Sequence, residues 1–184
     1  MSTTTTQNRI LAEHYTSPLI EADGPQQNPG ELSNWPMLKV AYRTDKDRIA
    51  SLLPPGLEPD DSALVLITFY NLPIQNAPEY GIAMNVAANY KGTAGEYTLG
   101  IGIDQETVIY PSKERWGQPK FHADTAYWRL GNRVEALTTH YGHTFAEFKG
   151  DVVGQQSSPG VCEQREFWVK YMRDVDLTPG KYDF

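Results

Sequence analysis

A lysine between a proline and a phenylalanine is the residue of this sequence that is the best candidate for a chemical reaction. Lys120 closes the run Tyr-Pro-Ser-Lys-Glu-Arg-Trp-Gly-Gln-Pro-Lys and is followed by Phe121. Pro119 biases the local backbone away from helix, and Phe121 adds apolar bulk, so we expect Lys120 to be half-buried. Burial lowers the pKa of a lysine and leaves more of it as the free amine, which attacks carbonyl groups. The alternative is an ordinary surface lysine whose stem covers apolar surface.

The segment before this lysine predicts the element that positions it. Pro111 suits the first turn of a short helix and Gly117 suits its end, so we expect a helix over residues 111–117. The chain then enters a second extended segment that carries Lys120. Residues 107–110, before the helix, are expected to be a strand.

Residues 104–120 resemble the lysine signature of the acetoacetate decarboxylase family. The matching features are an acidic turn, an apolar strand, the basic-Glu pair Lys113-Glu114, and the small residue and proline at Gly117 and Pro119, followed by Lys120. Upstream, residues 40–45, 53–58 and 79–81 resemble earlier family segments in order and spacing. The resemblance covers most of residues 37–130.

The resemblance implies roles for several residues. Lys120 falls on the Schiff-base lysine and Glu79 on the active-site glutamate, whose alternative reading is a solvated loop residue after Pro78. A second family lysine is replaced by Phe121, which leaves desolvation as the main means of activating Lys120. The family's carboxylate-binding arginine falls on Trp35, and an acidic pocket residue falls on Ile67. We expect the substrate site to be lined by Trp35, Phe121, Trp116 and Gln118.

Turn signals and short β-branched or aromatic runs favour a β-rich α+β fold with antiparallel strands and a few short helices. We expect strands at 37–42, 64–70, 82–90, 97–103, 125–130, 133–148 and 162–172, with residues 91–96 as a hairpin connection and Gly131-Asn132 as a turn. A helix capped by Thr44 is expected to end at Leu53, before Pro54. The family resemblance implies a cone-like β-barrel around an apolar pocket. Because family members usually continue past the equivalent of residue 184, we also expect that a C-terminal part is missing, cleaved or supplied by another chain.

The length of 184 residues predicts one domain over residues 36–184, preceded by an N-terminal arm over 1–35 that is partly disordered. The net charge of −7 argues against nucleic acid or an anionic membrane as a partner. A single cysteine, Cys162, rules out an internal disulfide. With no secretory signal or long apolar run, we expect a cytoplasmic protein, and the resemblance implies a homo-oligomer.

Three functions remain open at this point. The first is a Schiff-base lyase that decarboxylates a small 3-oxo acid, with Lys120 and Glu79 as catalytic residues and no metal or organic cofactor. The second is an aldolase-dehydratase that uses the same lysine imine. The third is a barrel that binds a small ligand without catalysis. His140 and His143 are expected to be a structural pair, since strand residues three apart point to opposite faces.

Overall fold

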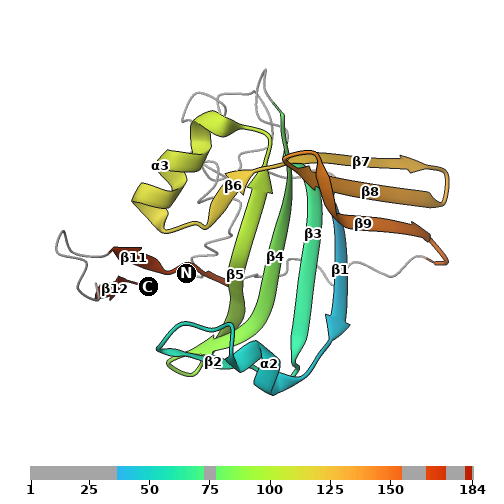
Figure 1. Cartoon of the computed structure of the whole chain (residues 1–184). Coiled ribbons are helices and arrows are strands. Elements are labelled where there is room, and N and C mark those ends of the chain that lie inside the picture. Colours follow the sequence, from blue (N-terminus) through green and yellow to red (C-terminus); the bar gives the residue numbers. More distant parts are fainter. Residues whose placement is uncertain (1–36, 73–77, 155–164, 173–180, 184) are drawn as a thin grey trace, which may run out of the picture.

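Strands dominate the computed structural model, which describes residues 37–72, 78–154, 165–172 and 181–183 (Figure 1). They form one large sheet, a three-stranded sheet and a two-stranded ribbon. The expected β-rich fold with few helices is therefore confirmed. The proposed arm and Trp35 lie outside the described residues.

Four antiparallel strands make the body of the large sheet. In spatial order they are β1 (Met37–Arg43), β3 (Leu64–Leu72), β4 (Glu79–Tyr90) and β5 (Thr93–Ile103), and β2 (Leu57–Pro59) pairs with the end of β4. The other edge of β5 receives two short parallel strands, β6 (Lys120–His122) and β10 (Glu166–Phe167). Over the described residues the sheet is open, whereas the resemblance implies a closed cone-like barrel.

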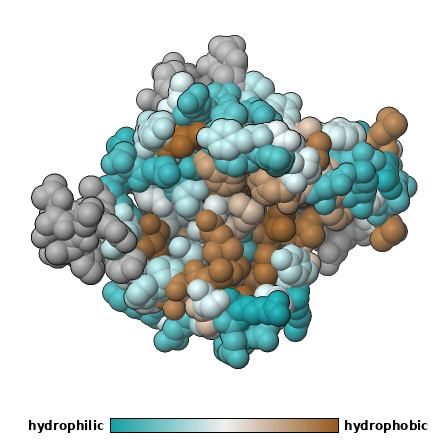
Figure 2. All heavy atoms as spheres, viewed as in Figure 1, coloured by the Kyte–Doolittle hydropathy of each residue, from teal (hydrophilic) through white to brown (hydrophobic). Residues whose placement is uncertain are grey.

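The two faces of this sheet have different neighbours. The outer face, which carries Phe69 and Ile82, packs against a meander of β7 (Asp124–Leu130), β8 (Arg133–His140) and β9 (His143–Asp151). Apolar residues gather over the middle of this face, which is the one seen in Figure 2. The hydrophobic contact between the two sheets therefore lies on the outer face.

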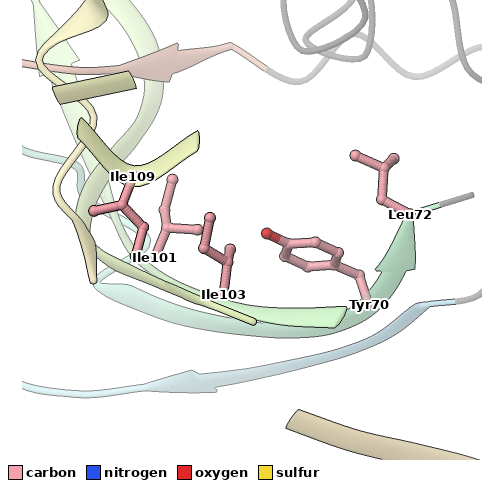
Figure 3. Close-up of a cluster of buried hydrophobic side chains, with 5 residues drawn as sticks. All are labelled: Tyr70, Leu72, Ile101, Ile103 and Ile109. Carbon is pink, nitrogen blue, oxygen red and sulfur yellow. The ribbon is translucent and has the colours of Figure 1, made fainter. Parts of the chain in front are cut away.

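The inner face carries a second apolar cluster on the concave side of the curved strands. Tyr70 and Leu72 of β3 and Ile101 and Ile103 of β5 rise from it, and Ile109 packs on them from outside the sheet (Figure 3). The hydroxyl of Tyr70 points along this face toward the isoleucines (Figure 3). This face also carries the buried charged residues described below.

The helix that supplies Ile109 is longer than predicted. α3 runs from Glu106 to Trp116, so Pro111 lies inside it and residues 107–110 are helical rather than a strand. A four-residue apolar run cannot distinguish a strand from a buried helical turn, and here the burial of Ile109 against the sheet favours the helix. The predicted end is confirmed, because Gly117 caps the helix in the left-handed conformation with φ 69°.

The first described helix also differs from the prediction. α2 covers Lys46–Ala50, and its N-cap is Asp45 instead of Thr44, with the Asp45 carboxylate accepting from the backbone N–H of Asp47 at 2.8 Å. The helix ends at Ala50 rather than Leu53. Aspartate is a stronger N-cap than threonine, and Asp45 stands one position after Thr44.

The hairpin connections are tighter than the sequence suggested. Residues 91–92 alone join β4 to β5, and Tyr141-Gly142 divides the predicted strand 133–148 into β8 and β9. Gly131-Asn132 forms the predicted turn between β7 and β8. At the C-terminal side, β11 (Lys170–Met172) pairs with β12 (Lys181–Asp183). Part of the predicted strand 162–172 lies outside the described residues.

Candidate active site

Lys120 is the first residue of β6 and is 1% exposed. It pairs with Ile101, and the backbone N–H of Ile101 donates to the carbonyl of Pro119 at 3.1 Å, which joins this short strand to the edge of β5. The end of α3 at Gly117 sets the direction in which the chain enters β6. The lysine is therefore positioned by backbone contacts on both sides.

Glu79 is the first residue of β4 and is 0% exposed, so it is a buried strand residue and not a solvated loop glutamate. Its Oε2 lies 3.8 Å from the Nζ of Lys120. The two residues are far apart in sequence and come together because β4 and β6 flank β5. The two side chains to which the resemblance gives catalytic roles thus lie next to each other.

Tyr70 is a third member of this group and was missed at the level of sequence. Its hydroxyl donates to the Oε1 of Glu79 at 2.9 Å. Gly81, which lies opposite Tyr70 on β4, leaves the space for the ring, because a Cβ at Gly81 would stand 2.4 Å from the Cζ of Tyr70. The only sequence signal was a tyrosine of the expected strand 64–70, with a glycine two residues after Glu79.

Burial dominates the electrostatics of Lys120. Removal from water lowers the pKa of the Lys120 ammonium below its ordinary value, and the negative charge of Glu79 opposes part of this change. The Nζ–Oε2 distance exceeds that of a direct hydrogen bond. Burial thus favours the amine form of Lys120, and the neighbouring carboxylate of Glu79 favours the ammonium form.

The other expected lining residues fall in different places. Gln118 is 1% exposed, two residues before Lys120, and its side-chain oxygen has no hydrogen-bond partner within the described residues. Trp116 is half-buried at the end of α3, with the guanidinium carbon of Arg115 5.3 Å from its ring centroid.

Phe121 is a correction to the expected substrate site. Its ring lies over Gly100 and Gly102 and meets His140 edge-on at a centroid distance of 5.3 Å. Since neighbouring strand residues point to opposite faces, Phe121 faces the outer side while Lys120 faces the inner side. Phe121 therefore belongs to the contact between the sheets.

The described residues hold no group of three or more His, Cys, Asp and Glu side chains arranged for a metal ion. His140 and His143 lie opposite each other across the turn between β8 and β9. In the same part of the chain, no helix is long and apolar enough to cross a membrane.

The fold and the site define a β-rich domain built around one buried lysine. The chain belongs to the acetoacetate decarboxylase family, whose family model matches residues 16–183. The chain is 29% identical to an acetoacetate decarboxylase of Paraburkholderia phytofirmans, over 92% of this chain and 69% of that protein. It is 30% identical to an acetoacetate decarboxylase of Burkholderia mallei, over 74% of this chain and 60% of that protein.

Solved structures give the same fold. The acetoacetate decarboxylase of Legionella pneumophila matches with a TM-score of 0.70 at 18% identity, over 99% of this chain and 76% of that chain. The enduracididine biosynthesis enzyme MppR matches with a TM-score of 0.63 at 16% identity, over 76% of this chain and 62% of that chain. These two solved structures therefore share the arrangement of strands seen in this chain.

Proposed function

We propose that this chain is a Schiff-base-forming lyase that acts on a small oxo acid and decarboxylates it. One observation carries the proposal: the amine of Lys120 lies beside the Glu79 carboxylate and is only 1% exposed. This burial lowers the pKa of Lys120. A lowered pKa leaves more of a lysine as the free amine, which is the nucleophile that imine chemistry requires. Membership of the acetoacetate decarboxylase family supports a lyase.

In the proposed reaction the Nζ of Lys120 adds to the carbonyl carbon of a 3-oxo acid, and the carbonyl oxygen leaves as water. The resulting protonated imine accepts the electron pair of the breaking bond to the carboxylate, so carbon dioxide departs and an enamine remains. A proton then adds to the enamine carbon. Water hydrolyses the imine, which releases the ketone and restores Lys120.

Glu79 is the proposed proton-transfer residue. One of its oxygens faces Lys120 at 3.8 Å, a distance that leaves the carboxylate near an imine nitrogen and its adjacent carbon. The other oxygen accepts from Tyr70, which fixes the carboxylate orientation. General acid–base catalysis by a positioned group contributes about 10²–10⁴ in rate.

Borohydride trapping with acetoacetate or acetone tests this function directly. Reduction of the imine should add the mass of the reduced ketone adduct to the peptide that contains Lys120. Lys120→Met should abolish the adduct, whereas Lys149→Met, at an exposed position on β9, should leave it unchanged. An unmodified Lys120 under these conditions would leave the non-catalytic ligand-binding reading and overturn the lyase.

The same imine supports a second candidate reaction, an aldol-type condensation followed by dehydration. The structural neighbour MppR was solved with the condensation product of pyruvate and imidazole 4-carboxaldehyde, which is the observation that favours this candidate. Acetone formation from acetoacetate, compared with product formation from pyruvate and an aldehyde, separates the two reactions.

The proposal includes a cone-like enclosure of Lys120 and a homo-oligomeric protein. The concave inner face in Figure 3 supports the enclosure. Support for an oligomer comes from the outer face, where Leu38, Ile67 and Met84 are only partly buried. Sedimentation of the purified chain measures the oligomeric state. A chain that is monomeric at every concentration tested would contradict the proposed homo-oligomer.

A further inference from the structure

The connection from β5 to α3 holds the backbone on both sides of Glu79. The N–H of Tyr80 donates to the Oδ1 of Asp104 at 3.0 Å, and the N–H of Asp104 donates to the carbonyl of Tyr80 at 3.2 Å. The side-chain amide of Gln105 donates to the carbonyl of Pro78 at 3.3 Å. We call Asp104 and Gln105 the Glu79 clamp, because the residues before and after Glu79 are each bonded to one of them.

The clamp extends the contact between β4 and β5 past the end of the strand ladder. That ladder ends at the pair Gly81–Ile103, two residues after Glu79. On its other side Glu79 pairs with Leu72, the last residue of β3. On the β5 side, the hydrogen bonds of the clamp therefore continue the contact over residues 78–80.

Gln105 makes its contact from a position that could otherwise serve the helix. It is the N-cap residue of α3, and its side chain makes no capping hydrogen bond. Serine, threonine, aspartate or asparagine would stabilise a helix more at this position. The amide of Gln105 therefore contributes to the start of β4 rather than to the start of α3.

The same end of β5 also holds the strand that carries the reactive amine. Lys120 of β6 pairs with Ile101, and the N–H of Ala123 donates to the carbonyl of Ile103 at 2.9 Å. The clamp follows directly in the chain. One short segment, residues 101–105, thus contacts both the strand of the amine and the strand of the carboxylate.

The position of the Glu79 carboxylate depends on its backbone as well as on its side-chain contacts. Tyr70 donates to one carboxylate oxygen, whereas the backbone sets where the side chain begins. The other oxygen lies 3.8 Å from the Nζ of Lys120. A misplacement of about 1 Å can cost about 100-fold in rate, so a shift at the start of β4 would reach the chemistry.

Asp104 offers both a hydrogen-bond acceptor and a charge. It is half-buried, and burial raises the pKa of Asp104, the hydrogen bond from the Tyr80 backbone opposes this change, and the charges of Glu79 and Asp124 add to it. When both are ionised, Asp104 and Glu79 repel each other. The contact that holds β4 is therefore the hydrogen bond, which an asparagine could also accept.

We propose that Asp104 and Gln105 are positioning residues for Glu79, which keep its carboxylate within reach of an imine on Lys120. They act through the backbone at the start of β4 and not on the substrate itself. This assignment rests on the proposed imine function and adds to it how Glu79 is held in place.

Rates of imine formation, measured by borohydride trapping at a series of acetone concentrations, test the clamp on the full chain. We expect Gln105→Ala to lower the saturating rate about fivefold, the equivalent of one hydrogen bond. Asp104→Ala should lower it about 100-fold, and Asp104→Asn should restore most of that loss. The acetone concentration at half-maximal rate should stay the same. Glu106→Ala, at the exposed next position of α3, is the matched control and should keep the wild-type rate.

The same substitutions in a Glu79→Gln chain separate positioning from support of the fold. Glu79→Gln alone should form the imine about 10²–10⁴ times more slowly. If the clamp acts through Glu79, adding Gln105→Ala or Asp104→Ala should slow this chain no further, because residues that act together are not additive. A melting temperature for each variant checks that it remains folded.

The outcomes separate the clamp from the function on which it rests. Failure of acetone to label Lys120 in the wild-type chain overturns the imine function. Wild-type rates in the Gln105→Ala and Asp104→Ala chains leave the imine function standing and overturn the clamp. Equal losses with Glu79 and with Glu79→Gln, or a raised half-maximal acetone concentration at an unchanged saturating rate, also overturn it.

Discussion

The lysine at the centre of the site is a residue whose burial has an energetic cost and a chemical benefit. Lys120 has a lowered pKa because its ammonium has lost water, and Glu79 offsets part of that loss. Position 121 cannot supply a charge to the amine directly, since its side chain points to the other face. Activation of Lys120 therefore depends on what covers the inner face.

The pH dependence of stability provides a test of that burial. Because the folded-state pKa of Lys120 lies below the unfolded value, the folded chain binds fewer protons between those two pKa values, and stability rises with pH across that window. Lys120→Met removes this contribution. We expect the variant's gain in unfolding free energy over the wild type to be largest below the folded-state pKa of Lys120 and to shrink toward about pH 10, where free lysine loses its proton.

Urea unfolding of both chains at several pH values measures this difference. Lys113→Met, at an exposed position on α3, is the matched control and should not follow the same trend. A gain that grows with rising pH would show that the ammonium is stabilised in the folded chain, which contradicts the proposed activation.

Tyr70 acts through Glu79, and Tyr70→Phe isolates that contribution. The ring stays and one hydrogen bond to Glu79 Oε1 is lost. We expect imine formation to slow by about 100-fold, the lower end of what a positioned acid or base supplies, and its pH profile to shift. Tyr110→Phe, on the exposed side of α3, is the control. An unchanged rate and pH profile would mean that Tyr70 only fills space.

At the scale of elements, the end of α3 decides where Lys120 begins its strand. Gly117 combines a positive φ with close contact, because a Cβ there would stand 2.7 Å from the backbone nitrogen of Lys170. Gly131 has a positive φ of 59° and open space around it. Alanine at Gly131 would therefore meet only the penalty of the positive φ, whereas alanine at Gly117 would meet that penalty and a steric clash with Lys170.

Alanine at each glycine gives a matched pair of variants. We expect Gly131→Ala to cost about 1–2 kcal/mol of unfolding free energy, the penalty of the left-handed region. Gly117→Ala should cost about 3 kcal/mol or more, because the contact adds to a conformational penalty of similar size, and it should reduce labelling of Lys120. Equal losses at the two positions would show that the contact with Lys170 does not matter.

At the scale of the whole molecule, structure and chemistry occupy opposite faces of one sheet. Ile82 follows Gly81 on β4 but points to the outer face, where it is 0% exposed in the cluster with Phe69 and Ala136. Its contacts hold the large sheet against the β7–β9 meander. The inner face beside it carries Glu79 and Lys120.

This division predicts that Ile82→Ala weakens the fold without changing the reaction. We expect a loss of about 2–5 kcal/mol, and about 0.5–1.5 kcal/mol for the milder Ile82→Val. Chains that remain folded should label at Lys120 at the wild-type rate. Loss of labelling in a folded Ile82→Val chain would show that the two faces are coupled.

Much of the strand pattern followed from local sequence signals. Alternating and β-branched runs predicted most strands, and Gly131-Asn132 and Gly117 predicted a turn and a helix end that the structure confirms. The start of α3 was not predictable, because the conformation of residues 107–110 depends on Ile109 packing against β5. The roles of Gly81 and Tyr70 likewise depend on strand register, which a single sequence does not encode locally.

The sequence by itself determined the reactive residue type, its proline-led strand and the family to which the chain belongs. Only the tertiary structure decided that Lys120 is buried, that Glu79 lies 3.8 Å from it and that Phe121 lies on the other face of the sheet. The reason is physical: burial and side-chain contact across strands depend on segments far apart in the chain. The residue type gives the functional group, whereas the pKa of that group depends on the residues that the tertiary structure places around it.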